Sequence, residues 1–408
     1  MRRVVVTGIG GMTALGDSWP AIRACLERGE TAIRYMPEWE RYDGINTRLA
    51  APITGFSATE LYPRKKTRTM GRVAGLAVYA TERALQGAGL LGDPIIVSGR
   101  TGIAYGSSFG SPPPVVSFAE LMMEGRSKTL NATSYIQMMS HSAAVNIGLF
   151  FGMQGRVIPT SSACTSGSHA IGYAAEAIRW GKADVMIAGG ADELDVTQAA
   201  VFDTLFATST RNAEPERTPR PYDRERDGLV IGEGAVSFVL EDYERAVARR
   251  APILAELVGF GSNADGSHAT QPQAETMALA MKEALGEAEL PTDAIGYVNG
   301  HGTATEWGDI AETQATQAVF GSRMPIHSLK SYFGHTLGAC GTLEAWLGIE
   351  MMNEGRVFPT ANLVEVDSRC AELDYLMTAP RRIEMDYFMT NNFAFGGLNT
   401  SLIFKRCR

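Results

Sequence analysis

Short runs of β-branched and apolar residues recur along the chain, and most of them stand beside a glycine-rich turn. The runs with the length of a strand are 3–8, 101–106, 157–160, 184–190, 235–240, 254–259, 295–298, 325–329, 387–391 and 400–405. Between many of them, apolar positions recur at helical spacing, over 73–88, 170–181, 276–288 and 343–353. Strands that alternate with helices predict βαβ crossovers around a largely buried sheet, and therefore an α/β protein.

Two segments far apart in the chain share one arrangement. Residues 158–179 and 326–351 each begin with an apolar strand, continue through small residues and end in a helix. The pattern Cys164-Thr-x-Gly stands in the first segment where His335-Thr-x-Gly stands in the second. We therefore expect two copies of one α/β unit, residues 1–250 and 251–408, each delivering a reactive side chain at a strand-to-helix turn. Chance similarity of so short a pattern is the alternative.

Composition and charge exclude several classes of protein. Of the 408 residues, 45% are hydrophobic and 20% are charged, which excludes a disordered or collagen-like chain. The apolar runs fall short of the roughly 18 residues that a membrane-spanning helix needs, so we expect no membrane association. With a net charge of −8, the chain lacks the basic character of a nucleic-acid-binding protein. An acidic partner would therefore have to bind at a local basic patch.

The five cysteines indicate a reducing environment, and we expect the protein in the cytoplasm. Their number is odd and no two of them form a CxxC pair, which argues against disulfides and a zinc site. His327 and His335 have no further ligands at metal spacing, so we expect no metal ion. The glycine-rich turn that begins at Gly8 has Thr13 where a dinucleotide-binding fingerprint has Gly or Ala, so we expect no bound dinucleotide.

Cys164 stands directly before a predicted helix that opens with Thr165, Ser166 and Gly167. At the N-terminus of a helix, the macrodipole and the free N–H groups favour the thiolate, which is the nucleophilic form of cysteine. The small neighbouring residues leave room for a substrate. Cys164 is therefore a candidate nucleophile, and an inert buried cysteine is the alternative.

Two of the six histidines are flanked by glycine, in Gly300-His301-Gly302 and Gly334-His335. A thiol nucleophile needs proton handling and an acyl thioester needs electrophilic help, so Cys164 and these two imidazoles form a defined constellation. Lys330 stands shortly before His335 at the end of an apolar run, and we expect it to be a buried cation. Two structural histidines and a surface lysine are the alternatives.

The motifs of the chain, in their order and spacing, resemble one family over essentially its whole length. The matching motifs are Ala163-Cys-Thr-Ser-Gly, Arg220-Pro-Tyr-Asp, Gly300-His-Gly-Thr-Ala-Thr, Lys330-Ser-x-x-Gly-His and Asn392-Phe-Ala-Phe-Gly-Gly-x-Asn. They are similar to those of the β-ketoacyl-acyl carrier protein synthases of the type I/II condensing-enzyme group. That resemblance implies the thiolase fold, a five-layered αβαβα body of two similar halves, which usually forms a dimer.

The resemblance also implies a role for each candidate residue. Cys164 would carry the acyl chain as a thioester, and His301 and His335 would stabilise the malonyl thioester oxygen while carbon dioxide leaves. Lys330 would hold the region of His335 electrostatically. The backbone N–H groups of Cys164 and Phe395 would form the oxyanion hole. No cofactor is implied beyond the phosphopantetheine arm of the acyl carrier protein that delivers the substrates.

Further positions match substrate contacts of that family. Thr303 and Thr305 would hold the phosphopantetheine arm, and Phe395 would gate the acyl pocket. Phe109 and Phe202 would line the acyl tunnel. Because Phe109 is bulkier than the aliphatic residue common at its position, the resemblance implies short or planar acyl chains.

The docking surface implied for the acidic carrier protein consists of Arg64, Lys65, Lys66, Arg68, Arg126 and Lys128. An ordinary solvated helix start is the alternative. We expect a homodimer, with a heterodimer containing a homologue similar to a chain-length factor as the alternative. At Tyr332, Phe333 and Leu398 the chain departs from the motifs of the housekeeping enzymes of this family. These departures leave a role in a specialised polyene or polyketide pathway open.

Two other functions stay open at this point. A papain-like cysteine hydrolase would use Cys164 with His301 and Asn299, but it would leave Lys330 and His335 idle. A non-catalytic partner subunit would be distinguished by the failure of Cys164 to accept an acyl group.

Overall fold

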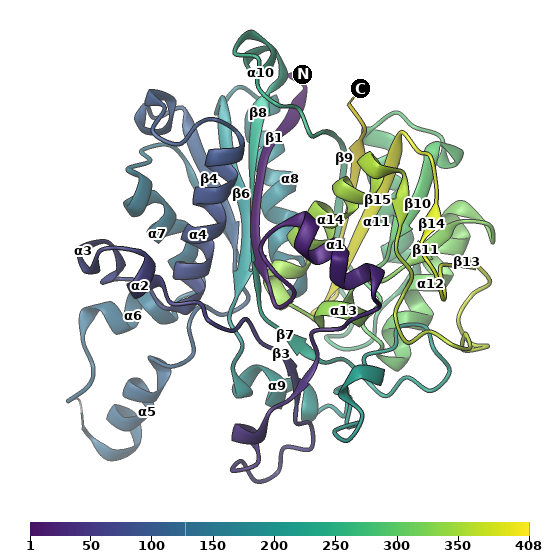
Figure 1. Cartoon of the computed structure of the whole chain (residues 1–408), viewed down its shortest axis with the longest axis horizontal. Helices are drawn as coiled ribbons and strands as arrows, with labels where there is room; N and C mark the ends of the chain where they lie inside the picture. The colour runs from purple at the N-terminus through teal and green to yellow at the C-terminus, as the bar shows by residue number, and fades with distance from the viewer. Residues whose placement is uncertain (127, 408) are drawn as a thin grey trace.

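A mixed sheet of eleven strands runs through the computed structural model, which describes residues 1–126 and 128–407 (Figure 1). In the order in which they neighbour one another, its strands are β13 (Asp374–Tyr375), β11 (Pro325–His327), β10 (Ile295–Asn299), β15 (Tyr387–Ala394), β16 (Leu398–Lys405), β9 (Ala255–Ala264), β1 (Val4–Thr13), β8 (Gly234–Asp242), β6 (Val185–Asp192), β4 (Thr101–Gly106) and β5 (Val157–Thr160). Every run of strand length predicted from the sequence lies in this sheet.

Ten of the eleven strands form the same five-stranded pattern twice, and the edge strand β13 lies outside it. In one half, β4 is parallel to β5 and β6, while β8 is antiparallel to β6 and β1. In the other half, β10 is parallel to β11 and β15, while β16 is antiparallel to β15 and β9. The halves meet where β1 pairs with β9, through Val5 with Glu256 and Val6 with Ala255. The predicted repeat is therefore present in the topology, and the boundary at residue 250 itself stays a prediction.

Helices cover both faces of each half and produce five layers (Figure 1). The helices α4 (Arg72–Gly87) and α7 (Ser142–Phe151) pack on the outer face of the N-terminal half. The helices α11 (Ala274–Glu287) and α12 (Glu306–Phe320) form the outer layer of the C-terminal half. Between the halves lie α8 (Ser166–Arg179) and α14 (Cys340–Glu354). The expected αβαβα thiolase fold is confirmed.

The two central helices approach closely because small residues line their contact. A Cβ atom at Gly167 would lie 2.8 Å from the carbonyl oxygen of Gly338 and 2.9 Å from the Thr342 Cγ2 atom. Glycine is therefore needed where α8 begins beside α14. This close approach brings the N-terminal ends of both helices, and the turns that precede them, into one site.

The repeat is in a different register from the one predicted. The 3₁₀ turns η3 (Ala163–Thr165) and η6 (Leu337–Ala339) lead into α8 and α14, and each opens on a left-handed residue, with φ of 50° at Ala163 and 49° at Leu337. Cys164 is therefore equivalent to Gly338. The expectation that His335 is equivalent to Cys164 is wrong, because the short helix α13 (Lys330–Phe333) precedes the second turn and shifts the Thr-x-Gly pattern.

The remaining elements are short. The helices are α1 (Trp19–Glu27), α2 (Ala58–Leu61), α3 (Arg64–Thr67), α5 (Val115–Glu124), α6 (Ala132–Met138), α9 (Val196–Asp203) and α10 (Tyr243–Ala248), and the other 3₁₀ turns are η1 (Pro37–Trp39), η2 (Pro94–Val97), η4 (Pro215–Arg217) and η5 (Thr292–Ala294). Small sheets join β2 (Arg34–Tyr35), β3 (Leu49–Ala51) and β7 (Ile231–Gly232), and β12 (Arg356–Val357) with β14 (Arg381–Arg382). Within residues 1–126 and 128–407, none of the helices has the length and apolar character needed to cross a bilayer.

Candidate active site

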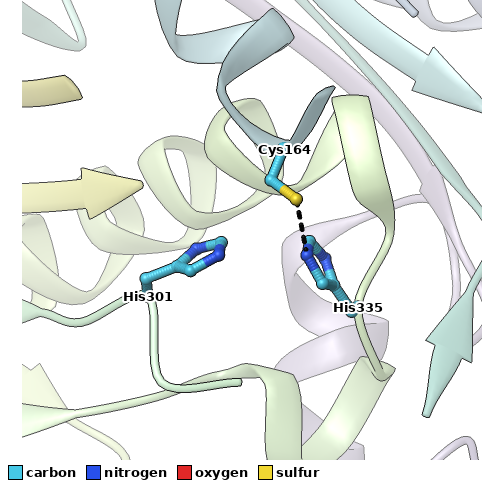
Figure 2. Close-up of side chains that lie close together, drawn as sticks. All are labelled: Cys164, His301 and His335. Atoms are coloured by element: carbon cyan, nitrogen blue, oxygen red, sulfur yellow. Dashed lines mark hydrogen bonds between the residues drawn. The ribbon is translucent and has the colours of Figure 1, made fainter. Parts of the chain in front are cut away.

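Cys164 lies in the turn between β5 and α8, buried at the contact of the two halves. Its Sγ atom lies 3.0 Å from Nε2 of His335, and Figure 2 shows the imidazole of His301 directed toward the same point. The left-handed backbone at Ala163 turns the chain so that the thiol precedes the first turn of α8. The structure therefore brings together the cysteine and the two histidines that the sequence singled out.

His335 presents a hydrogen atom to the thiol. Its Nδ1 atom accepts a hydrogen bond of 3.2 Å from the backbone N–H of Leu337, so in the neutral ring the proton is on Nε2. The backbone N–H of His335 donates to Val230, and its carbonyl accepts from Gly232 in β7. These bonds hold the ring with its Nε2–H directed at Cys164.

His301 has the same tautomer for a different reason. Its Nδ1 atom lies 3.0 Å from Nζ of Lys330 and 3.3 Å from Nδ2 of Asn392, and both of these groups are donors. The proton of the neutral His301 ring is therefore on Nε2. The backbone N–H groups of His301 and Gly302 donate to the carboxylate of Glu312 in α12, which fixes the loop after β10. The two imidazole centroids lie 5.2 Å apart, with the rings nearly perpendicular.

Lys330 is buried, with an exposed fraction of 2%, so the surface alternative is wrong. Burial alone would lower the pKa of this ammonium group, but the carboxylate of Glu344, with which it forms an ion pair, raises the pKa above its usual value. The other carboxylate oxygen of Glu344 accepts a hydrogen bond of 2.6 Å from Asn392. The site therefore contains a permanent cation behind His301.

The electrostatics of the site keep both imidazoles neutral. Burial, followed by the charge of Lys330, holds the pKa of His301 and that of His335 well below the usual value of histidine. Burial raises the pKa of the Cys164 thiol to about 11. The backbone N–H of Phe395, the charge of Lys330 and the backbone N–H of Cys164 itself each lower this pKa, but by less than burial raises it. The helix start was expected to favour the thiolate, and burial outweighs that effect.

A cavity of about 540 Å³ leads to Cys164 and brings together most of the predicted substrate contacts. Thr303 and Thr305 line it, with their hydroxyl oxygens 2.7 Å apart. Phe202 and Phe395 also line it, with ring centroids 6.2 Å apart in an edge-to-face arrangement. Phe109 is not among the lining residues, and 45% of its side chain is exposed, so its place in an acyl tunnel stays a prediction.

The predicted docking residues lie on the surface and outside this cavity. Arg64, Lys65, Lys66 and Arg68 are exposed in and after α3, and Lys128 is exposed in the loop between α5 and α6. The ammonium of Lys66 packs 4.6 Å from the ring centroid of Phe150, and Arg126 forms an ion pair with Glu124. The remaining cations of this group are available for an acidic partner.

Several supporting residues were not singled out as site residues from the sequence. Glu312 and Glu344 hold the His301 loop and Lys330, and Asn392 contacts both Glu344 and His301. Asp192, at the end of β6, accepts hydrogen bonds from Ser107 and from the backbone of Gly338. One signal in the sequence could have identified such residues, namely an acidic residue within an apolar helical segment, as Glu344 is within α14.

The papain-like arrangement is not formed. In the described part of the chain, His301 Nδ1 is contacted by Lys330 and Asn392, whereas the Asn299 amide nitrogen faces the carbonyl oxygen of Glu344 at 3.3 Å. Moreover, an imidazole that holds its proton on Nε2 cannot accept the proton of the adjacent thiol. The geometry therefore disfavours a cysteine hydrolase.

Among the described residues, two sets of side chains bring possible metal-binding atoms within 4.8 Å of one another: Cys164 with His301 and His335, and His301 with Cys340 and Glu344. In the first set, the imidazole nitrogens that face the thiol carry protons, which blocks coordination. In the second set, the Lys330 ammonium already lies beside His301 and Glu344. The residues are therefore better suited to donating hydrogen bonds than to holding a metal.

A buried thiol facing two imidazole N–H donors in a thiolase fold defines a thioester-processing class of enzyme. The model of the Beta-ketoacyl synthase N-terminal domain matches residues 1–246, and that of the Beta-ketoacyl synthase C-terminal domain matches residues 254–364. The chain belongs to the β-ketoacyl synthase family.

Similar proteins support this membership over the full length. The 3-oxoacyl-[acyl-carrier-protein] synthase 2 of Vibrio cholerae is 37% identical over 99% of both chains. The crystal structure of a β-ketoacyl synthase from Burkholderia phymatum has 58% identity and a TM-score of 0.99 over 100% of both chains. The ishigamide ketosynthase/chain length factor has 27% identity and a TM-score of 0.90, also over 100% of both chains.

Proposed function

We propose that the protein is a 3-oxoacyl-[acyl-carrier-protein] synthase that condenses an acyl chain on Cys164 with a malonyl group. The observation that carries this proposal is the convergence of two neutral Nε2–H donors beside one buried thiol. Donors of this kind stabilise an oxyanion or an enolate oxygen. A hydrolase would instead need an imidazole that accepts a proton from the thiol.

The first half-reaction transfers the acyl group to Cys164. The sulfur attacks the thioester carbonyl of the acyl carrier protein, and the tetrahedral oxyanion lies against the backbone N–H groups of Cys164 and Phe395. The same two N–H groups act on the thiol in the free protein and lower its pKa. The C–S bond to the carrier breaks, and the carrier thiolate takes the proton that Cys164 loses. His335 donates its Nε2–H to the sulfur and favours the anionic form.

The second half-reaction forms the new carbon–carbon bond. The malonyl thioester oxygen accepts hydrogen bonds from Nε2–H of His301 and His335, and carbon dioxide leaves as the enolate forms. The enolate carbon attacks the acyl group on Cys164, the C–S bond to Cys164 breaks, and the released thiolate takes a proton from solvent. Lys330 acts through His301, since its ammonium holds Nδ1 as an acceptor and so keeps the proton on Nε2.

The cavity accommodates the arm that brings these groups to Cys164. Thr303 and Thr305 offer hydroxyl groups to the polar amides of the phosphopantetheine arm. Phe395 contacts Phe202 across the cavity, and Gly396 and Gly397 follow it with φ of 93° and 73°. These left-handed glycines allow the loop that carries Phe395 to change conformation, which would open the acyl pocket.

The histidine pKa values predict a flat pH profile for decarboxylation. Because the pKa of both imidazoles lies well below 6.5, each ring stays neutral above that pH, and its Nε2–H is available throughout the neutral range. We expect the rate of carbon dioxide release from malonyl carrier protein to show no inflection near pH 6.5 between about pH 6 and 8. Lys330→Met should lower that rate roughly tenfold or more, because Nδ1 of His301 then keeps only the more distant donor Asn392, at 3.3 Å, and the tautomer with its proton on Nδ1 becomes accessible.

Lys182→Met is a suitable control, since Lys182 is exposed beyond the far end of α8. Melting temperatures of both variants would identify any loss of folding. A wild-type profile with an inflection near pH 6.5, or equal effects of the two substitutions, would contradict the role given to Lys330.

We also propose that the protein forms a homodimer through the edge of the sheet at β5. This strand ends the strand order, and its residue Val157 is 43% exposed. The helix α5 has an apolar sequence without a buried residue, and Phe109, Tyr135 and Leu149, all from the N-terminal half, are also exposed. An exposed apolar edge of this kind is typical of an interface, and a twofold axis would pair β5 with its copy.

We expect sedimentation equilibrium to give twice the mass of the chain at micromolar concentration, and Val157→Lys to shift the protein toward the monomer. Val247→Lys, at an apolar position of similar exposure on α10, should leave the dimer intact. A monomeric wild type would contradict the homodimer. If that monomer paired only with a second ketosynthase-like chain, the heterodimer would be supported instead.

We propose that Lys65 and Arg68, with Arg64, Lys66, Arg126 and Lys128, attract the acidic carrier protein.

The acyl group that loads onto Cys164 identifies the preferred chain length and indicates the pathway. Intact-mass measurement after incubation with a panel of acyl carrier proteins tests the proposed function directly, because each loaded acyl group adds its own mass to the protein.

A further inference from the structure

Phe206 has an unusual conformation and environment. It follows α9 with a left-handed φ of 54°, and 88% of its side chain is exposed. The turn is closed by hydrogen bonds from the backbone N–H groups of Phe206 to Asp203 and of Ala207 to Phe202. Glycine or asparagine usually occupies such a position, because a bulky residue there strains the backbone. Because Phe206 is 88% exposed, it buries little apolar surface against the described part of the chain, and its packing contributes little stability.

Trp307 shares these surroundings. It is the second residue of α12, and 64% of its side chain is exposed. Phe206, Trp307 and the 45% exposed Leu205 all line the cavity that has Cys164 at its inner end. The outer part of the cavity therefore has an apolar rim made by the end of α9 and the start of α12. We call Leu205, Phe206 and Trp307 the apolar rim.

The charged groups beside the apolar rim are occupied within the chain. Arg226 lies 2.6 Å from Asp367 and 3.5 Å from Asp309, and its side chain is 2% exposed. Glu306 forms an ion pair with Arg369. Among the described residues that line the cavity, these pairs reduce the charge available at its outer part. A partner that sits there contacts the apolar side chains of the rim, whereas at α3 it meets exposed cations.

We propose that Phe206 and Trp307 form an apolar contact site for the body of the carrier protein. This inference rests on the proposed function, since a thioester arm that reaches Cys164 must leave through the cavity and its carrier must then lie against the rim. Exposed aromatic residues at an interface contribute much of the binding energy. The carrier protein would therefore bind through two separable terms, an electrostatic one from α3 and an apolar one from the apolar rim.

Steady-state kinetics with three malonyl thioesters tests the site: malonyl carrier protein, malonyl-pantetheine and malonyl-N-acetylcysteamine. Phe206→Ala and Trp307→Ala should each raise KM for malonyl carrier protein about tenfold, with kcat within twofold. KM for the two small thioesters should not change. Trp180→Ala is the matched control, because Trp180 is 67% exposed and follows the far end of α8. We expect that variant to behave as wild type.

A second variant separates binding from folding. Phe206→Gly removes the aromatic ring and accepts the left-handed backbone, so it should raise the melting temperature by about 1 °C or more while raising KM as Phe206→Ala does. An increase in stability together with a loss of carrier binding would show that Phe206 is retained for contact. A melting temperature that falls with an unchanged KM would overturn the proposal.

Salt dependence distinguishes the two binding terms. Charge reversal of Lys65 and Arg68 should flatten the dependence of KM on ionic strength, whereas Phe206→Ala should keep the wild-type slope. An unchanged KM for malonyl carrier protein in Phe206→Ala and Trp307→Ala would show that the apolar rim is not a contact site. An equal rise for malonyl-pantetheine would also do so, since the arm would then be the group bound. If wild type condensed none of the substrates, the proposed function itself would fail.

Discussion

Replacing Cys164 by alanine will abolish acyl loading and lower the rate of condensation by roughly 10³-fold or more, because Cys164 is the one cysteine among the described residues that lines the cavity. The Sγ atom of Cys164 lies against His335 Nε2 and the backbone N–H of Phe395, and it faces the cavity. Intact-mass measurement after incubation with acyl carrier proteins should show one added acyl group on wild type and none on Cys164→Ala.

Cys340 is the matched control for this experiment. It is buried beside the site, and its thiol donates a hydrogen bond of 3.2 Å to the carbonyl oxygen of Cys164. Cys340→Ser keeps a donor at that position and should still load one acyl group. Acylation that persists in Cys164→Ala and disappears in Cys340→Ser would show that Cys340, and not Cys164, is the nucleophile.

Replacing His335 by alanine will reduce carbon dioxide release from malonyl carrier protein about 10²- to 10³-fold, and acylation of Cys164 by a much smaller factor. The difference follows from the position of the proton. Nδ1 of His335 accepts from Leu337, so the ring acts as a donor toward the malonyl oxygen and not as a base toward the thiol. Acylation retains the two backbone N–H groups at Cys164 and Phe395.

The two half-reactions can be measured separately, with trapped carbon dioxide for decarboxylation and intact mass for acylation. His301→Ala should give the same pattern as His335→Ala, because Lys330 and Asn392 give His301 the same tautomer. His327→Asn is a useful control, since His327 is buried with Nδ1 2.7 Å from the carbonyl oxygen of Phe358. Equal loss of both half-reactions in His335→Ala would count against this division of labour.

The strands were predictable because of the way they are buried. Central strands of this sheet lie between two helical layers, so their residues are apolar on both faces and appear as uninterrupted runs. The predicted run 101–106 coincides with β4, whose residues are all buried, and the run 235–240 lies within β8. The predicted helix 73–88 likewise corresponds to α4, which is buried over the continuous run from Val73 to Thr81 and again at Ala84 and Leu85.

The features that were missed depend on contacts between distant segments. Several buried residues of the helix α12 are polar, as Glu312 is. A search for apolar residues at helical spacing therefore did not find this helix. The register of the repeat depends on the left-handed residues Ala163 and Leu337, and a four-residue pattern does not reveal a backbone conformation. The raised pKa of Cys164 also depends on burial by both halves of the fold, while the local helix start favoured the opposite direction.

The sequence by itself determined the alternation of strands and helices and singled out the candidate reactive groups, because apolar spacing and glycine-flanked side chains are local properties of the chain. Only the tertiary structure decided the chemistry available to those groups. The tautomers of His301 and His335 are set by donors from Lys330, Asn392 and Leu337, and the charge of Lys330 is retained in the interior by Glu344. A proton's position depends on which donors and charges surround the ring, and folding brings those together from separate segments.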